Sequence, residues 1–238
     1  MSQTAPRTAI VTGAGKRVGA EIARALIVDG WRVVAHVHHE ADAVTKGAIK
    51  VAADLADPDC AAAIVGAAGP GPMLLVNNAA RFAQDGFGSF SPAQFADHMA
   101  INVAAPALLI EAFAKVAPAG ALVVNLLDAK LTAPNPDFLS YTLSKQALAG
   151  LTEMAARALA GQGIRVNGIA PSVMLPSGEQ RNFEEVHRFN PLGIGVEPGD
   201  VVRALRYLIE ARAVTGEIMT VDGGQRFMQL ARDVQFVT

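Results

Sequence analysis

The sequence of 238 residues contains one cysteine, Cys60. A single cysteine excludes an intrachain disulfide and a cysteine-based metal cluster, and it fits a reducing compartment. No apolar core follows a basic head at the N-terminus, and apolar runs such as VAAPALLI stop well short of the roughly 18 residues that span a bilayer. We therefore expect a cytoplasmic protein.

A strong charge of either sign is also missing, because the formal net charge is -2 and both signs are scattered along the chain. Without a basic stripe, the sequence argues against nucleic-acid binding. Hydrophobic residues make up 51% of the chain and charged residues 18%, which excludes a disordered protein. We find no repeat, low-complexity tract or linker, so one domain over residues 1–238 is expected.

Short β-rich apolar runs alternate with longer Ala/Leu-rich segments of helical period. Strands this uniformly apolar are covered on both faces, which predicts a doubly wound α/β fold of the Rossmann type, with a parallel sheet and helices on each side. The connection HHEADAVTKG between the second and third runs barely fits a crossover helix. The seven expected strands are TAIVT, WRVVAHV, AIKVAAD, MLLVNNA, ALVVNLL, IRVNGIA and GEIMTVDGG.

Two irregular segments follow strand ends, Ala80 to Pro92 and Pro171 to Asp200. Open α/β sheets bind ligands beyond the carboxyl ends of their strands, so both segments are expected near a site. The second, at about residues 171–200, is long enough to form a lid over a substrate.

A glycine-rich stretch, TGAGKRVG, directly follows the first strand. Gly13 permits a tight turn, Gly19 permits close packing of the next helix, and the free amides of that helix face a pyrophosphate. An ordinary strand-to-helix turn is the alternative. The position at the first strand favours dinucleotide binding.

The tip of the second strand reads HVHHE, without the carboxylate that would bind the ribose hydroxyl of NAD. Lys16 and Arg17 add positive charge nearby, and His38 lies at the tip, so we expect NADP(H). His36 and His38 share a strand face, but no third ligand is close in sequence, and we expect no metal site.

Polar residues also end the third and fourth strands. Asp54 is placed to accept a hydrogen bond from the adenine amino group, with the backbone of Leu55 at the ring edge; a helix N-cap is the alternative for Asp54. The amides of Asn77 and Asn78 are able to bridge neighbouring strands and the cofactor ribose.

Tyr141 and Lys145 are one helical turn apart and project from one face. A lysine ammonium beside a tyrosine favours the phenolate and lowers the tyrosine pKa, which would make Tyr141 a general acid. A surface pair is the alternative. The pair opens a helix after a strand, and the chain has only two tyrosines.

The motifs TGAGKRVG, NNAA, INVAAP, YTLSK, RVNGIAPS and VTGEIMTVDGG resemble, in order and spacing, those of the short-chain dehydrogenase/reductase family. The resemblance implies that Tyr141 protonates the substrate, that Lys145 binds the nicotinamide ribose, and that Asn102 holds a water relaying protons to Lys145. The expected cofactor contacts are Gly13, Lys16, Arg17, Val18, Gly19, His38, Asp54, Leu55, Asn77, Ala79, Tyr141, Lys145, Pro171 and Met174.

Three departures from the general family pattern concern the substrate. Asp128 stands where most members have serine, Arg17 replaces the middle glycine of TGxxxGxG, and Phe82 replaces a small or aliphatic residue. Together they resemble the pteridine reductase branch, which includes the bacterial dihydromonapterin reductases.

The same three residues suit a flat heterocycle edged with amino and ring-nitrogen groups. Phe82 is able to stack on one ring face, Arg17 to offer planar donors, and Asp128 to accept from ring N–H groups, to orient Tyr141 or to supply a proton. Each has a plain alternative: a loop cap for Asp128, a phosphate ligand for Arg17 and a core residue for Phe82.

We therefore expect an NADPH-dependent reductase of a dihydropterin, such as dihydromonapterin or dihydrobiopterin, with Arg17, Phe82, Asp128 and Tyr141 at the substrate. One alternative is a carbonyl reductase of a 3-oxoacyl or other ketone. Another is a dinucleotide-sensing regulator without chemistry, against which the complete set of Asn102, Tyr141 and Lys145 argues.

Two helical segments, VAAPALLIEAFAKVA and YTLSKQALAGLTEMAARALAG, are apolar on more than one face. A helix apolar nearly all round is buried on both sides. One side takes the sheet, and we expect the other to take a second subunit, in a homotetramer or a dimer.

Overall fold

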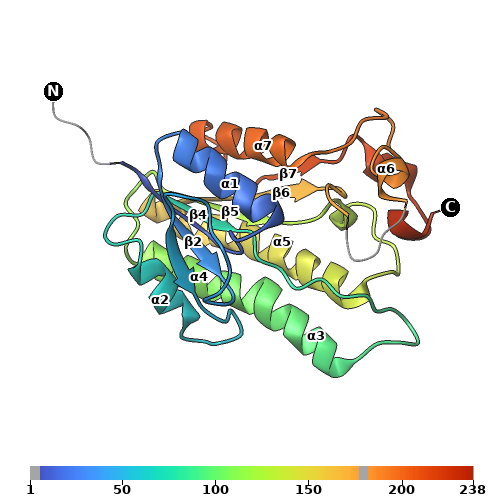
Figure 1. Cartoon of the computed structure of the whole chain (residues 1–238), viewed down its shortest axis with the longest axis horizontal. Helices are drawn as coiled ribbons and strands as arrows, with labels where there is room; N and C mark the ends of the chain where they lie inside the picture. Colours follow the sequence, from blue (N-terminus) through green and yellow to red (C-terminus); the bar gives the residue numbers. More distant parts are fainter. Residues whose placement is uncertain (1–5, 177–181, 238) are drawn as a thin grey trace.

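A computed structural model describes residues 6–176 and 182–237. Its centre is a sheet that lies between layers of helices (Figure 1). The strand order is β3-β2-β1-β4-β5-β6-β7, and every neighbouring pair is parallel. The expected doubly wound fold is confirmed. The strands are β1 (Thr8–Val11), β2 (Arg32–Val37), β3 (Ile49–Ala52), β4 (Leu74–Asn77), β5 (Leu122–Leu126), β6 (Arg165–Pro171) and β7 (Ile218–Val221).

Six strands fall within a predicted apolar run, and β6 extends one residue beyond its run, to Pro171. Every residue of the central strands β1, β4 and β5 is buried, whereas the edge strands β3 and β7 are mostly half-buried. Apolar side chains point alternately to the two faces of a strand, so both faces of the sheet must be covered.

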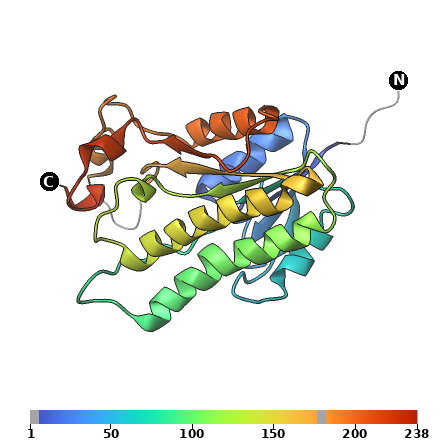
Figure 2. The same ribbon diagram turned by 180° about the vertical axis from the view of Figure 1, so that it is seen from behind.

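Helices cover both faces of the sheet (Figures 1 and 2). Helices α1 (Arg17–Val28) and α7 (Pro198–Glu210) pack together on one face, and α2 (Cys60–Gly66), α4 (Ala105–Ala114) and α5 (Leu139–Leu159) lie on the other. Each face has its own core. Ile22 and Leu205 belong to the core on the α1 and α7 side, and Ile64 and Phe113 belong to the core on the opposite side.

Shorter elements lie mainly beyond the carboxyl ends of the strands. Helix α3 (Pro92–Met99) has Ser91 as its N-cap, with the side chain accepting from Gln94 N, and it runs through a π-helical turn, η1 (Ala100–Ala104), into α4. The others are η2 (Ala129–Leu131), η3 (Ala160–Gln162), α6 (Phe183–Val186), η4 (Gln225–Met228) and η5 (Val234–Phe236).

The direction of chain progression reverses between β1 and β4, which are neighbours in the sheet. In open α/β sheets the ligand cleft lies at such a point, beyond the carboxyl ends of the strands. The connection from β2 to β3 contains no helix, as its brevity predicted. This leaves the tips of β2 and β3 open toward the cleft.

Among the described residues, no helix has the length and apolarity needed to cross a membrane. The predicted lid segment, residues 171–200, includes α6 and the first turn of α7. Its residues 177–181 lie outside the described residues. Both the closure of this segment and the single-domain organisation of residues 1–238 stay predictions.

Candidate active site

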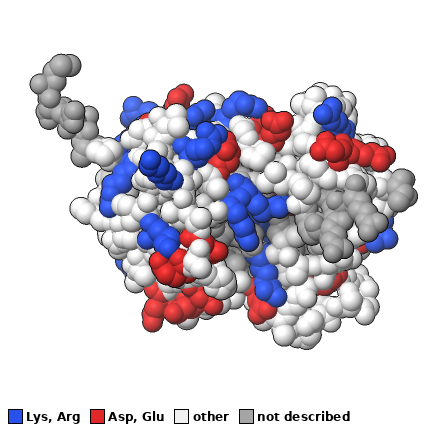
Figure 3. Space-filling model, viewed as in Figure 1, with Lys and Arg blue, Asp and Glu red and all other residues white. Residues whose placement is uncertain are grey.

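A cavity of about 850 Å³ lies beyond the carboxyl ends of the strands. Lysine and arginine side chains lie beside the hollow in the middle of the face that Figure 3 shows. The predicted site residues that line this cavity are Gly13, Lys16, Arg17, Val18, Gly19, His38, Asp54, Leu55, Ala79, Phe82, Asp128, Tyr141, Lys145, Pro171 and Met174. Two predicted residues, Asn77 and Asn102, do not line it.

The glycine loop after β1 forms one end of the cavity. Gly13 has a φ of 63°, in the left-handed region that favours glycine. A Cβ on Gly19 would lie 2.2 Å from the carbonyl oxygen of Gly13, so only glycine fits there. Asn78 fastens the loop to β4, because its Nδ2 donates to the carbonyls of Thr12 at 2.9 Å and Gly13 at 3.2 Å.

This loop fits a dinucleotide pyrophosphate. The close approach at Gly19 brings the start of α1 against the strand end, and the amides of the first helical turn have no partner within the helix. Lys16 and Arg17 line the same end of the cavity. The residues present therefore suit a doubly charged phosphate group.

We expect Gly19→Ala to weaken dinucleotide binding by about tenfold or more, because a methyl group at 2.2 Å from a backbone oxygen must displace the loop. Titration of dinucleotide by fluorescence, with wild-type and variant protein, measures the dissociation constant. Gly66→Ala in α2 is the matched control, since a Cβ there meets nothing within 4 Å. Equal affinity of Gly19→Ala and the wild type would contradict this account of the loop.

The tips of β2 and β3 form the adjoining wall. His36 is buried, and its Nδ1 accepts from the backbone amide of Gly13 at 3.2 Å while its Nε2 lies 3.0 Å from the carbonyl oxygen of Ala53. Burial lowers the pKa of His36, which favours the neutral ring that this bonding requires. His36 thus joins the glycine loop, through Nδ1, to the residue that follows β3, through Nε2.

His38 and Asp54 face each other at the mouth of the same wall, with His38 Nε2 3.8 Å from Asp54 Oδ1. Asp54 also accepts from the amide of Ala56 at 2.9 Å, in a turn that ends before α2 begins at Cys60. The alternative role of Asp54 as the N-cap of that helix is therefore wrong, and its carboxylate lines the cavity.

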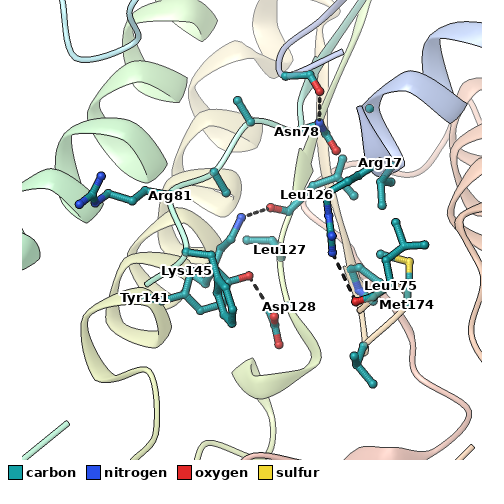
Figure 4. A pocket seen from close by; sticks show the side chains of 18 of the residues that line it. Arg17, Asn78, Arg81, Leu126, Leu127, Asp128, Tyr141, Lys145, Met174 and Leu175 are labelled. Atoms are coloured by element: carbon teal, nitrogen blue, oxygen red, sulfur yellow. Dashed lines mark hydrogen bonds between the residues drawn. The ribbon is translucent and has the colours of Figure 1, made fainter. Parts of the chain in front are cut away.

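Arg17 has a φ of 53°, in the left-handed region that favours glycine. A left-handed conformation costs a residue with a Cβ about 1–2 kcal/mol, so the side chain must compensate elsewhere. Its guanidinium donates to the carbonyl of Pro176 at 2.8 Å. It also donates to the carbonyl of Leu175 at 3.3 Å (Figure 4). Arg17 thereby joins the glycine loop to the segment after β6.

The predicted place of Asn77 at the cofactor ribose is wrong. Asn77 is buried within β4, and its Nδ2 donates to Asn125 Oδ1 of β5 at 2.8 Å. Asn125 in turn donates to Thr152 of α5 at 2.9 Å. The Asn77 side chain thus bridges β4 and β5, as predicted, and it does not line the cavity.

At the other end of the cavity, Tyr141 and Asp128 form a direct pair (Figure 4). The Tyr141 hydroxyl donates to Asp128 Oδ2 at 3.0 Å, and the other oxygen, Oδ1, accepts from the amide of Lys130 at 2.9 Å. Asp128 thus caps η2 with one oxygen and holds the tyrosine with the other. The loop cap and the chemical role are both compatible with this geometry.

Burial dominates the acid–base properties of this pair. It raises the pKa of Asp128, against the opposing hydrogen bond from Lys130. It also raises the pKa of Tyr141 well above the usual value of 10, and the Asp128 carboxylate adds to the rise. The expectation of a lowered pKa for Tyr141 is wrong, because low polarity and the adjacent negative charge both favour the protonated phenol.

Lys145 lies on the same face of α5 as Tyr141, with its Nζ 5.7 Å from the centre of the tyrosine ring. The ammonium group donates to the carbonyl oxygen of Leu126 at 2.6 Å (Figure 4). Burial lowers the pKa of Lys145 to about 8. Its charge is therefore lost on moderate alkalinisation.

We expect kcat/KM to fall as the pH rises through about 8, because deprotonation removes the cation beside Tyr141. Initial rates measured from neutral to alkaline pH give the pH profile of kcat/KM and its falling alkaline limb. Lys145→Arg should move the limb to higher pH, since a guanidinium keeps its charge there. An identical limb in Lys145→Arg would assign the titration to another group.

Asn102 supports the site from behind. Its Oδ1 accepts from the amide of Arg81 at 2.8 Å, and its Nδ2 donates to the carbonyl of Arg81 at 3.0 Å and to Ser144 Oγ at 2.9 Å. The side chain joins the end of the β4 loop to α5. The proton relay through Asn102 stays a prediction.

Phe82 lines the cavity and is 43% exposed, so its alternative role as a core residue is wrong. One face of its ring stacks on Phe138 with centroids 4.4 Å apart, and its ring meets that of Tyr141 edge-on at 4.8 Å. Phe82 therefore brings an aromatic surface to the proton donor.

Sequence reasoning missed the C-terminal segment, which closes the same end of the cavity through Gln225, Arg226, Leu230 and residues 233–235. Lys130 pairs with Asp233 at 2.7 Å, and Arg232 pairs with Asp137 at 2.8 Å. These ion pairs hold the C-terminal segment against the β5–α5 loop. No motif marks them in the sequence, because the partners are about a hundred residues apart.

Comparison with known proteins identifies a family model and several similar relatives. Residues 13–226 match the family model described as enoyl-(acyl carrier protein) reductase. The chain is 33% identical to pteridine reductase 1 of Leishmania tarentolae, covering 94% of this chain and 97% of that protein. It is also 33% identical to galactitol 2-dehydrogenase (L-tagatose-forming) of Cereibacter sphaeroides, covering 91% and 93%.

Among solved structures, FolM alternative dihydrofolate reductase 1 from Brucella canis, complexed with NADP, superimposes with a TM-score of 0.84. It is 34% identical, and the match covers 93% of this chain and 94% of that one.

Proposed function

Because the chain belongs to the short-chain dehydrogenase/reductase family, in its pteridine reductase-like branch, we propose that it reduces a pteridine with NADPH. The observation that carries this proposal is the hydrogen bond of 3.0 Å between Tyr141 and Asp128, in a cavity that Arg17 and Phe82 also line. The substrate class is a dihydropterin, such as dihydromonapterin or dihydrobiopterin.

NADP(H) is the cofactor, and its site is the glycine-loop end of the cavity. Gly13, Val18 and Gly19 would hold the pyrophosphate, with Lys16 and His38 toward the 2'-phosphate and Asp54 with Leu55 at the adenine. Ala79, Lys145, Pro171 and Met174 would hold the nicotinamide half. When bound, the cofactor supplies the hydride.

The residues of this chain manage the accompanying proton. Tyr141 keeps its proton at neutral pH because its pKa is raised, and it donates that proton to the ring nitrogen beside the carbon that accepts the hydride. Asp128 orients the tyrosine hydroxyl. With a raised pKa, Asp128 is also suited to return a proton to Tyr141.

A flat heterocycle fits the cavity beside Phe82 and Asp128, with Arg17 on the glycine-loop side, better than a simple ketone does. A ketone needs one donor at its oxygen, whereas a pterin presents a ring face and several N–H groups. Phe82 offers an exposed aromatic face, Asp128 an acceptor and Arg17 a planar donor.

The test is oxidation of NADPH by the purified protein with dihydromonapterin or dihydrobiopterin as the acceptor. We expect turnover that depends on the pterin. Absence of pterin turnover together with efficient reduction of a ketone would overturn the proposal.

A carbonyl reductase is the second candidate, favoured by the equal identity to galactitol 2-dehydrogenase. As a carbonyl reductase, the protein would reduce a 3-oxoacyl or sugar-like ketone, with Asp128 in place of the usual serine. A panel of such ketones assayed beside the pterins distinguishes the two candidates.

A homotetramer or dimer is part of the proposal. Leu143 and Met154 of α5 are 40% and 65% exposed in the chain, and a second subunit would cover them. Analytical ultracentrifugation should give an oligomer at micromolar concentration. A monomer under those conditions would contradict this part.

A further inference from the structure

We infer that Asp85 is a positioning residue for Tyr141, which caps helix α5 from outside the helix and fastens the loop carrying Phe82 to it. This inference rests on the proposed reductase function, in which Tyr141 donates the proton. It adds a residue that neither the sequence motifs nor the lining of the cavity reveals.

Helix α5 begins without a cap of its own. The residue at its N-cap position, Phe138, is left-handed with a φ of 56°, and its side chain makes no capping hydrogen bond. The first amides of a helix lack partners within the helix and need acceptors from elsewhere. Because α5 carries both Tyr141 and Lys145, any group that fixes its first turn also fixes the position of these two side chains.

Asp85 supplies those acceptors from a position 55 residues earlier in the chain. Its backbone carbonyl accepts from the amide of Phe138 at 3.0 Å, and its carboxylate accepts from the amide of Ser140 at 3.0 and 3.3 Å. The hydroxyl of Ser140 donates to the same carboxylate. A negative charge at this end also complements the helix dipole.

The carboxylate of Asp85 is otherwise shielded, since the residue is only 5% exposed. A buried charge is costly unless hydrogen bonds satisfy it, so Asp85 and the start of α5 constrain each other. Ser140, which donates to this carboxylate, is fully buried and directly precedes Tyr141. A displacement of the Asp85 carboxylate would therefore move Ser140 and, through the next peptide bond, the backbone of Tyr141.

The loop and the helix also meet through aromatic rings. Phe82, three residues before Asp85, stacks on Phe138 at 4.4 Å and touches Tyr141 edge-on. Asn102 holds the start of this loop at Arg81, and Ser91 ends it by capping α3. Asp85 thus sets the separation between the surface of Phe82 and the hydroxyl of Tyr141.

The test compares Asp85→Ala and Asp85→Asn with the control Ser91→Ala, which removes a helix cap at the far end of the same loop. We expect Asp85→Ala to lower kcat by about tenfold to a hundredfold, because small misplacements of a catalytic group have effects of that size. NADPH affinity should stay unchanged. Asp85→Asn keeps an oxygen acceptor for the Ser140 amide and should recover part of the loss.

Hydrogen exchange supplies a readout that needs no substrate. The amides from Phe138 to Thr142 should exchange faster in Asp85→Ala and at the wild-type rate in Ser91→Ala. Unchanged exchange there, or a kcat unaffected in both Asp85 variants, would overturn the inference. If Asp85→Ala does not fold, Asp85→Asn alone decides by the same two measurements.

Rates are measured with whichever acceptor the wild-type protein reduces, pterin or ketone. Failure of pterin turnover would thus overturn the proposed substrate and leave the Asp85 comparison intact. Normal pterin turnover with unaltered Asp85 variants would overturn only the role of Asp85.

Discussion

Replacing Tyr141 by phenylalanine should lower kcat by about 10²- to 10⁴-fold, the range that a positioned general acid contributes. The change removes the hydroxyl that donates to Asp128 and leaves the buried ring in place. Binding of NADPH should persist, because Lys145 and the glycine loop are untouched. Steady-state oxidation of NADPH measures kcat, and fluorescence titration measures the affinity.

The chain provides its own control, since the second of its two tyrosines, Tyr207, lies on α7 and is 52% exposed. Tyr207→Phe should have the activity of the wild type. A Tyr141→Phe variant as active as the wild type would remove Tyr141 from the mechanism. Dinucleotide binding by the wild-type protein without turnover of any acceptor would instead favour the sensing regulator.

Replacing Asp128 by asparagine should lower kcat/KM for the pterin by about a hundredfold, while ketone reduction, if present, should change far less. Asparagine keeps an oxygen for the amide of Lys130 but loses the negative oxygen that receives the Tyr141 hydroxyl. The ratio of the two effects measures how far Asp128 determines the substrate. Equal losses on both substrates would show that Asp128 acts through Tyr141 and does not determine the substrate.

The same variant should be more stable than the wild type at neutral pH. Burial raises the pKa of Asp128 above its ordinary 3.8, so the folded protein holds a proton there more tightly than the unfolded chain does. Asp128 therefore favours folding at pH values below 3.8, and this contribution is lost as the pH rises through the raised pKa. Asparagine does not ionise, so the stability difference should grow toward neutral pH. Urea unfolding at acidic and neutral pH measures it.

Much of the fold was predictable because apolar runs and glycine positions are local properties. Apart from the last residue of β6, all seven strands lie inside predicted runs, and the connection between β2 and β3, which was expected barely to fit a helix, contains none. The cavity residues beyond the strand ends were also predictable, since parallel strands present their carboxyl ends at one edge. The predicted contact of Asn77 with the cofactor was wrong because its side chain forms a hydrogen bond with Asn125 of the neighbouring strand, which the sequence does not reveal.

The acid–base properties were not predictable in the same way. Spacing alone places Tyr141 and Lys145 on one helix face, and from that the sequence indicated a lowered tyrosine pKa. In the folded chain Lys145 donates to Leu126, while Asp128 and burial act on Tyr141 in the opposite direction. A pKa depends on solvent exclusion from every side, which no local motif contains.

The sequence by itself determined the sheet, the dinucleotide loop and the identity of Asp128, Tyr141 and Lys145, because each depends on neighbours within a few residues or on regular periodicity. Only the tertiary structure decided that Asp128 bonds Tyr141, that Asp85 caps α5 and that the C-terminal segment closes the cavity. These contacts join residues 13 to about 100 positions apart, and the packing of the layers alone brings them together.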